Sequence, residues 1–318
     1  MKMEQRILFG VDDSDFALQA VAATGRLLRN SKNQGVTLFH GARDVEISLL
    51  SRALHLTHEA IEEYRRLFLL EEQKVLDRAR EVLVENGLGA DKLETVLEEK
   101  CNHVAESMLR LATSEGFKTL ALARWGTNTV GRQVMGSVTY RLAQMAEETA
   151  MWVIDPRIAS HDVLLTVVGA PISRRVMDYA VRYFAHLRES KFTFFHVIPP
   201  LPPQYWDPGQ SLNQQGFRAE PERTELLMRE YVERVEKVME EGRDRLIRAG
   251  VPEQNVVFKV QAQQRGIARD ILVELEQGHH GILLIGRKGS KAISRFGLGS
   301  KANKLLHGAQ ALVICLVP

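Results

Sequence analysis

The chain has 318 residues, of which 45% are apolar and 26% charged, and its formal net charge is only +2. This length exceeds the roughly 250–300 residues at which a single hydrophobic core stops growing, so two domains are expected. The near-neutral charge excludes a general nucleic-acid or membrane-surface partner as the default, and no apolar run reaches the about 18 residues that predict a membrane span.

The first half begins with an apolar run that predicts a buried strand, I-L-F-G-V-D-D-S-D-F-A at 7–17, ending in a polar turn. A second run, V-T-L-F-H-G at 36–41, precedes a long helical stretch from about 46 to 86 that stops at Gly87. Two further apolar runs follow, T-L-A-L-A-R-W-G at 119–126 and A-M-W-V-I-D-P at 150–156. Short apolar strands alternating with helices predict βαβ units and a parallel sheet buried on both faces.

The second half repeats this order of elements. Its four strand-like runs are V-L-L-T-V-V-G-A-P-I-S-R-R at 163–175, F-T-F-F-H-V at 192–197, G-I-L-L-I-G-R-K-G at 281–289 and A-L-V-I-C-L-V-P at 311–318. A proline-rich stretch between Pro199 and Pro221 predicts a long loop, and the helical periodicity after it stops at Gly250. The duplication predicts an α/β chain of two tandem open parallel-sheet domains, a first repeat at 1–157 and a second repeat at 158–318.

A glycine pattern lies in the second repeat where open α/β sheets bind ligands, beyond the carboxyl end of a strand. Gly286-Arg287-Lys288-Gly289, nine residues and Gly299-Ser300 follow the apolar run at 282–285 and precede the helical pattern at 301–306. Glycines allow positive φ and a close approach of backbone amides to phosphate, and a helix start adds partial positive charge. The side chains of Arg287, Lys288, Lys291 and Arg295 are expected to add charge to this loop. A plain strand end and turn is the competing interpretation of the glycines alone.

The spacing G-x2-G-x9-G-S after a fourth strand resembles the phosphate-binding signature of ATP-binding universal stress proteins. The run Val11-Asp12-Asp13-Ser14 resembles that family's opening V-D-x-S, and His196-Val197 resembles its second-strand end. The resemblance covers both halves. It implies Rossmann-like, adenine nucleotide alpha hydrolase-like domains, an adenine nucleotide as partner, and ATP, with Mg2+ left open, as cofactor of a stress-response regulatory protein.

The second repeat matches this family pattern at all four signature positions, Gly286, Gly289, Gly299 and Ser300. It also keeps Val197, where the family contacts adenine through the backbone. It lacks the Asp that lies against the nucleoside in the family, because Val168 stands there. We therefore expect the second repeat to be the principal nucleotide site.

The first repeat matches the pattern less completely. It keeps Asp12 at the nucleoside position, and Gly126, Gly136 and Ser137 of the signature. Ala123 replaces the first signature glycine, and Gly41 stands where the second repeat has Val197. These residues predict a second nucleotide site. Asp12 is equally well explained as a cap or turn residue for the following helix.

Two alternatives stay open. The same fold without a ligand is an interaction module, because family members commonly pair through their last strands. Here residues 311–317 and 151–154 are expected to form that pair within one chain, leaving other faces for a homodimer. The other alternative is an adenylating or flavin-type α/β enzyme, for which the sequence shows no nucleophile, base or flavin site.

No catalytic or metal residue is therefore proposed, and slow ATP hydrolysis is left open. His40 and His196 are expected to hydrogen-bond at strand ends, and His55 and His58 to lie on a surface face. Ser14 and Ser173 are expected in caps or turns, and the tryptophans in packing or an interface. With only Cys101 and Cys315, the chain is typical of a reducing cytoplasm.

Overall fold

The structure is a computed structural model of the whole chain, and it describes residues 5–42, 57–126, 135–200, 221–287 and 297–318. Each repeat contributes five strands and four longer helices among these residues. The first repeat holds β1 (Gln5–Gly10), α1 (Asp15–Leu28), β2 (Gln34–Gly41), α3 (His58–Glu85), β3 (Leu93–Glu98), α4 (Val104–Glu115), β4 (Thr119–Ala123), α5 (Ser137–Met145) and β5 (Ala150–Ile154). The second repeat holds β6 (Val163–Thr166), α6 (Ala170–Phe184), β7 (Phe192–Ile198), α7 (Pro221–Arg248), β8 (Val256–Ala262), α8 (Ile267–Gln277), β9 (Ile282–Gly286), α9 (Ser300–Gly308) and β10 (Val313–Val317).

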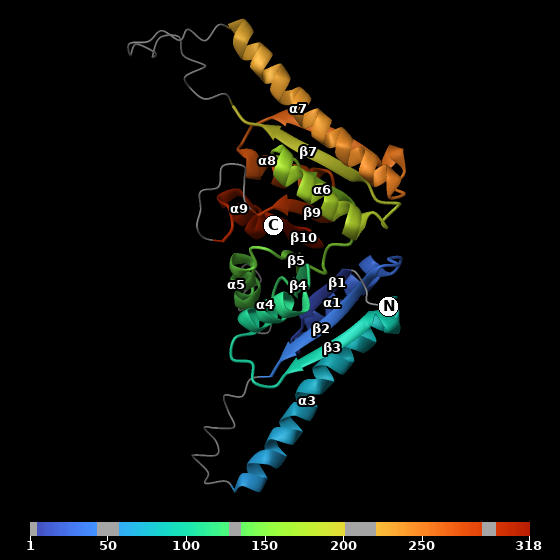
Figure 1. Cartoon of the computed structure of the whole chain (residues 1–318), viewed down its shortest axis with the longest axis vertical. Coiled ribbons are helices and arrows are strands. Elements are labelled where there is room, and N and C mark those ends of the chain that lie inside the picture. The colour runs from blue at the N-terminus through green and yellow to red at the C-terminus, as the bar shows by residue number, and fades with distance from the viewer. Residues whose placement is uncertain (1–4, 43–56, 127–134, 201–220, 288–296) are drawn as a thin grey trace, which may run out of the picture.

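One continuous sheet runs through the molecule, in the order β3-β2-β1-β4-β5-β10-β9-β6-β7-β8. The strand pairs described within each repeat are parallel, whereas β5 and β10 pair antiparallel at the centre (Figure 1). The expected pairing of the last strands of the two repeats is therefore confirmed. The α/β fold with parallel sheets in both halves is confirmed as well.

Helices cover both faces of the sheet and enclose two hydrophobic cores. One core lies under α1, α3, α6 and α7, and the other under α4, α5, α8 and α9. The 28-residue helices α3 and α7 extend away from the centre of the molecule (Figure 1). Among the helices that the structure describes, none has the length and apolar character needed to cross a bilayer.

Local signals in the sequence explain where several helices begin and end. Ser14 caps α1, because its hydroxyl accepts a hydrogen bond from the amide of Ala17 at 3.1 Å. Gly87 and Gly250 follow α3 and α7 with φ of 103° and 98°, the left-handed conformation that ends a helix. Both predicted stops are thus confirmed. The first part of the helical stretch predicted from about residue 46 lies outside the described residues, as does most of the predicted proline-rich loop.

The junction between the repeats is built around Trp152 of β5. This side chain is fully buried, stacks on Phe184 of α6 with ring centroids 5.2 Å apart, and meets Tyr183 edge-on at 6.0 Å. Its Nε1 donates a hydrogen bond to the hydroxyl of Tyr179 at 2.9 Å. Directly opposite Trp152 in the sheet stands Cys315, a much smaller side chain. The expected packing or interface role of Trp152 is confirmed, and it joins the two repeats.

Candidate functional site

Two short helices begin at the carboxyl edge of the sheet, where the sequence predicts ligand sites. Helix α5 starts after the segment that follows β4, with Gly136 as its N-cap, and α9 starts after the segment that follows β9, with Gly299 as its N-cap. Neither helix has a side-chain cap or an acidic residue in its first turn among the described residues. The first-turn amides of a helix lack intrahelical partners, so both N-termini are suited to an anion.

The two signature glycines at these helix starts close their loops. The amide of Gly136 donates to the carbonyl of Arg124, and the amide of Gly299 donates to the carbonyl of Arg287, both at 2.9 Å. Gly136 and Gly299 have φ of −55° and −61°, so neither position uses the positive φ that glycine allows. These two amides are used within the protein, which leaves the amides of the first helical turns to meet a ligand.

The first signature position is Gly286 in the second repeat and Ala123 in the first, and the backbone conformation does not require a glycine there. Gly286 ends β9 and pairs with Val317, and it is not among the glycines with positive φ. Ala123 ends β4 in the same way and pairs with Ile154. An alanine is therefore accommodated at this place without backbone strain, and Ala123 does not by itself disable the first repeat.

Arg287 does not add charge beside the phosphate loop, as the sequence pattern led us to expect. Its guanidinium crosses to the first repeat and donates through Nη2 to the carbonyl of Ala143 in α5. Only 2% of the residue is exposed, and burial lowers the pKa of the guanidinium to about 10. The physical reason is the helix end of the other repeat, whose free carbonyl attracts the side chain. The other predicted loop residues, Lys288, Gly289, Lys291 and Arg295, lie outside the described residues.

Asp12 and Gly126 of the first repeat lie against each other. One carboxylate oxygen of Asp12 accepts hydrogen bonds from the amide of Ser14, at 3.1 Å, and from its hydroxyl. A Cβ atom at Gly126 would lie 2.7 Å from the other oxygen, so a larger residue there would require the carboxylate to move. Asp12 therefore forms a turn before α1, while Ser14 is the cap. The structure brings two predicted site residues together here.

The second repeat closes the equivalent turn with a serine instead of a carboxylate. The hydroxyl of Ser173 accepts hydrogen bonds from the amides of Val168 and Gly169 at 3.0 and 3.2 Å, and the residue is fully buried. The turn role predicted for Ser173 is confirmed. Because the hydroxyl holds both amides, the turn keeps its shape without a charged residue.

The ends of the second strands also differ for a packing reason. Val197 in β7 is buried in the core. At Gly41 in β2, a Cβ atom would lie 2.5 Å from Sγ of Cys101, so the cysteine occupies the space that a side chain would need. The missing valine of the first repeat thus reflects a neighbouring side chain, which the local sequence pattern does not reveal.

Both strand-end histidines hydrogen-bond as expected. Nδ1 of His40 lies 2.8 Å from the carbonyl oxygen of Val11, and Nδ1 of His196 lies 2.6 Å from that of Val167. Their Nε2 atoms reach the long helices, where His40 contacts the Glu72 carboxylate and His196 contacts a tyrosine hydroxyl. Burial lowers the pKa of His196. Both rings tie the first and second strands to a long helix.

Sequence reasoning missed the part played by Arg124, which is the counterpart of Arg287. Arg124 is 7% exposed and donates to three carbonyls at the end of α9 in the second repeat. The sequence did contain a hint of this role, because an arginine directly follows β4 in the first repeat and β9 in the second. Its partner was not predictable, because it belongs to the other repeat. Among the described residues no cluster of three or more His, Cys, Asp or Glu side chains is arranged to hold a metal ion.

Comparison with known proteins places both repeats in one family. The model of the universal stress protein family matches residues 3–153 and again residues 160–316. The universal stress protein YxiE of Bacillus subtilis is 23% identical over 146 residues, which is 45% of this chain and 95% of that protein.

Solved structures match the whole chain in fold. A universal stress protein from Archaeoglobus fulgidus has a TM-score of 0.61 at 12% identity, over 100% of this chain and 99% of that one. A protein of unknown function from Pseudomonas aeruginosa has a TM-score of 0.60 at 12% identity, over 98% and 92%. These identities show the fold alone. Because the family model covers both halves, the chain belongs to the universal stress protein family, as a member with two tandem domains.

Proposed function

We propose that this chain is an ATP-binding regulatory protein of the stress response. The observation that carries the proposal is the pair of helix N-termini at the carboxyl edge, each preceded by a buried strand and lacking a side-chain cap. The triphosphate would lie against the first turns of α9 and α5, near Ser300 and Ser137. Amides there donate to phosphate oxygens, and the helix dipole favours their negative charge. Bound ATP with Mg2+ would shift the protein toward the conformation that binds it more tightly.

The second repeat is the stronger of the two proposed sites. The exposed Lys301 lies in the first turn of α9, whereas the first turn of α5 has no basic residue. Hydrogen bonds to charged phosphate are roughly twice as strong as neutral ones. The nucleoside contact that Asp12 offers in the first repeat contributes on the order of 1 kcal/mol if its edge stays solvated. The adenine would extend toward the end of β7, near Val197.

Thermal unfolding with and without ATP and Mg2+ tests the proposal. A ligand that binds only the folded protein raises the melting temperature. We expect a rise for the wild type, loss of most of it in Gly299→Asp, and loss of a smaller part in Gly136→Asp. Both substitutions fit the observed φ values, and each places a negative charge where phosphate would bind. Gln277→Glu adds the same charge on the exposed end of α8 and is expected to change nothing.

The contrary result is equally definite. A melting temperature that ATP does not move in the wild type would remove the nucleotide proposal and favour the ligand-free interaction module. Equal losses in Gly299→Asp and Gly136→Asp would show that the second repeat is not the principal site. Mass spectrometry of small molecules released from the purified protein identifies a nucleotide that copurifies with it.

A further inference from the structure

A reciprocal pair of arginines joins the two repeats near the proposed sites. Arg124 follows β4 and Arg287 follows β9, at the same place in each repeat. Both side chains are almost completely buried, and burial lowers the pKa of both guanidinium groups. Each leaves its own repeat and contacts the last turn of a helix in the other.

The contacts of the two arginines correspond to each other. Arg124 donates to the carbonyls of Ala309, at 2.5 Å, and of His307, at 2.8 Å. It donates also to Leu306 at 3.2 Å, while Arg287 donates to Ala143. The last carbonyls of a helix have no intrahelical partner and carry partial negative charge. Each guanidinium therefore stabilises a helix end that belongs to the other repeat.

The helices that receive these arginines are those that begin at the proposed phosphate positions. The end of α9 contacts Arg124, and its start is Ser300. The end of α5 contacts Arg287, and its start is Ser137. Each helix has 9 residues, so its two ends are only about 13 Å apart. A further contact, from the amide of Leu298 to Oε1 of Gln144 at 3.4 Å, joins the last turn of α5 to the residue before Gly299.

Each arginine is also bonded through its backbone to the helix start of its own repeat. The carbonyl of Arg124 accepts from the amide of Gly136, and that of Arg287 from Gly299. A ligand at the start of α5 is therefore linked to the end of α9 through Gly136 and Arg124. The same path leads from α9 through Gly299 and Arg287 to α5.

We propose that Arg124 and Arg287 couple the two nucleotide sites crosswise, so that each arginine positions the phosphate-binding helix of the other repeat. This inference rests on the proposed function for its ligand. Ordering one site fixes the arginine that supports the other, so the coupling is positive, and by linkage it is equal in both directions. Arg124 makes the stronger link. It forms three hydrogen bonds, whereas Nε and Nη1 of Arg287 are buried without a hydrogen-bond partner among the described residues.

Two measurements test the coupling, the first without nucleotide. Hydrogen exchange of the ligand-free protein should show faster exchange in α9 for Arg124→Met, and in α5 for Arg287→Met, with the larger effect in α9. Arg110→Met, which removes an exposed arginine paired with Glu98, is the matched control and should leave both helices unchanged. Arg124→Lys should restore part of the protection, because it keeps a donor and the charge.

The second measurement is ATP affinity by calorimetry in proteins with one site. In the Gly136→Asp background only the second-repeat site remains, and Arg124→Met should weaken it by about fivefold. In the Gly299→Asp background, Arg287→Met should weaken the first-repeat site by a smaller factor. The coupling would be overturned if each arginine variant speeds hydrogen exchange only in its own repeat. It would also be overturned if ATP affinity is unchanged both by Arg124→Met in the Gly136→Asp background and by Arg287→Met in the Gly299→Asp background. If the wild type does not bind ATP, but each arginine variant still speeds exchange in the other repeat, the proposed function is rejected and the structural link between the repeats stands.

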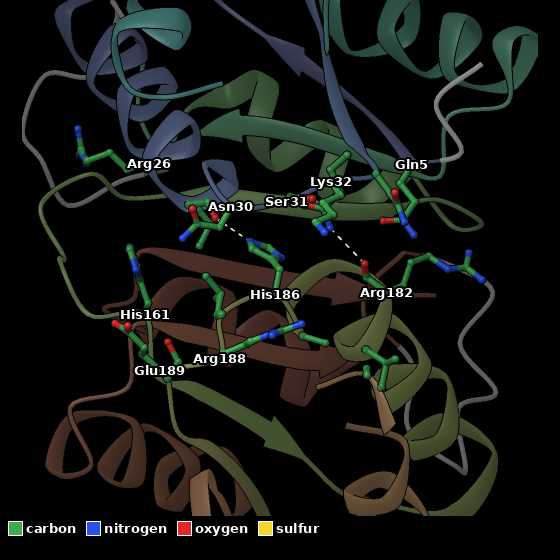
Figure 2. A pocket seen from close by; sticks show the side chains of 18 residues that line it. Gln5, Arg26, Asn30, Ser31, Lys32, His161, Arg182, His186, Arg188 and Glu189 are labelled. Atoms are coloured by element: carbon green, nitrogen blue, oxygen red, sulfur yellow. Dashed lines mark hydrogen bonds between the residues drawn. The ribbon is translucent and has the colours of Figure 1, made fainter. Parts of the chain in front are cut away.

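A second and independent observation is a cavity of about 770 Å³ between the repeats. It lies by the last turns of α1 and α6, away from the carboxyl edge. Figure 2 shows Asn30, Ser31 and Lys32 on one side of it and His161, His186, Arg188 and Glu189 on the other. We call it the waist cavity. Both repeats contribute to its walls, so a ligand there would contact both.

The charge of the waist cavity is unbalanced. Four cations line it, Arg26, Lys32, Arg182 and Arg188, and Glu189 is the one carboxylate among the described residues of its wall. The ends of α1 and α6 add about half a negative charge each, and some of their carbonyls already accept from His186 and Gln34. Asp162, beside the wall, also acts electrostatically on His161, so the sum leaves about one positive charge unmatched. In the described part of the chain, Lys32, Arg182 and Arg188 form no ion pair with a carboxylate.

We infer that the waist cavity binds a small phosphate-bearing anion that bridges the repeats. Lys32 from the first repeat and Arg188 from the second would provide charge-assisted hydrogen bonds. His161 and His186 report on the site. Burial lowers the pKa of both, with Arg26 as a further cause at His161, and a bound anion would raise both values.

Titration with inorganic pyrophosphate, without Mg2+, tests this site in the Gly136→Asp/Gly299→Asp protein, in which the nucleotide sites are blocked. We expect binding by calorimetry and a rise of the His161 and His186 pKa values by NMR. Lys32→Gln/Arg188→Gln should weaken binding by at least about tenfold. Arg66→Gln/Lys74→Gln removes two exposed cations of α3 and is the control. No binding, or equal binding in both double variants, would overturn the inference. ADP in place of pyrophosphate shows whether a free anion or a nucleotide is preferred.

Discussion

The two repeats use the same framework at the carboxyl edge but different side chains within it. Both close the loop after the fourth strand with an arginine carbonyl and a glycine amide, and both begin the next helix with Gly-Ser. The turn after the first strand is held by a carboxylate, Asp12, in one repeat and by a hydroxyl, Ser173, in the other. The difference teaches that the same backbone geometry can be held by different side chains in this fold. The spacing of the glycines alone therefore does not show which side chain holds the turn in each repeat.

The junction shows the largest difference between equivalent positions. Trp152 and Cys315 pair across the central strands, and both are fully buried. Trp152→Ala should lower the free energy of unfolding by about 3–5 kcal/mol, because it leaves a cavity against α6. Cys315→Ala should cost about 1 kcal/mol, because it removes one buried sulfur. Urea unfolding measures both, and equal costs would show that Trp152 does not anchor the junction.

The strand ends give the next contrast. Gly41→Val places in the first repeat the residue that the second repeat has as Val197. It should lower the free energy of unfolding by about 1–3 kcal/mol, because the new side chain overlaps Cys101. Adding Cys101→Ala should recover part of the loss, since it removes the nearest atom. Thermal unfolding of the single and double variants measures this, and a stable Gly41→Val protein would contradict the packing explanation.

The first signature position allows a smaller and sharper test. Ala123→Gly gives the first repeat a glycine where Gly286 stands in the second. It should cost about 0.5–1 kcal/mol of stability, because glycine loses more entropy within a strand. It should leave ATP affinity in the Gly299→Asp background unchanged, since neither position needs positive φ. A clear gain in affinity measured by calorimetry would restore a role for this glycine.

The smallest expected effect concerns acid stability. Burial lowers the pKa of His196, so the folded protein holds this ring neutral. Its contribution to stability is present above the unfolded value of 6.5 and is lost as the pH falls below it. His161, His186 and His280 have lowered pKa values too and act in the same direction. His196→Gln should therefore reduce, without abolishing, the loss of stability between about pH 7.5 and about pH 5.5. Urea midpoints across this range measure the change, and an unchanged slope would show that His196 does not contribute.

Much of the fold could be predicted from local patterns. The duplication, eight of the ten strands described in the chain, the helix stops at glycine and the pairing of the last strands follow from apolar runs and turn residues that are close in sequence. The outer strands β3 and β8 were not predicted. Both lie at the edges of the sheet and are only partly buried, so their apolar signal is weak.

The candidate sites were predictable in outline only. Glycine spacing located the two helix starts, but it could not show where Arg287 points or why Gly41 lacks a side chain. Those answers depend on Ala143 and Cys101, which are distant in sequence and are brought close only by packing. Contacts between residues of different repeats cannot be predicted from the pattern of neighbouring residues in the sequence.

The pairing of Trp152 with Cys315 has a consequence for how the two halves diverge. Where two identical subunits meet on a two-fold axis, a residue on the axis must face its own copy. Covalent fusion removes that constraint, because the halves are held together at high effective concentration and need not be self-complementary. A bulky indole can then fit against a small thiol, which two separate copies of either half could not reproduce. Two repeats in one chain can therefore differ at the junction while they stay in a fixed one-to-one ratio.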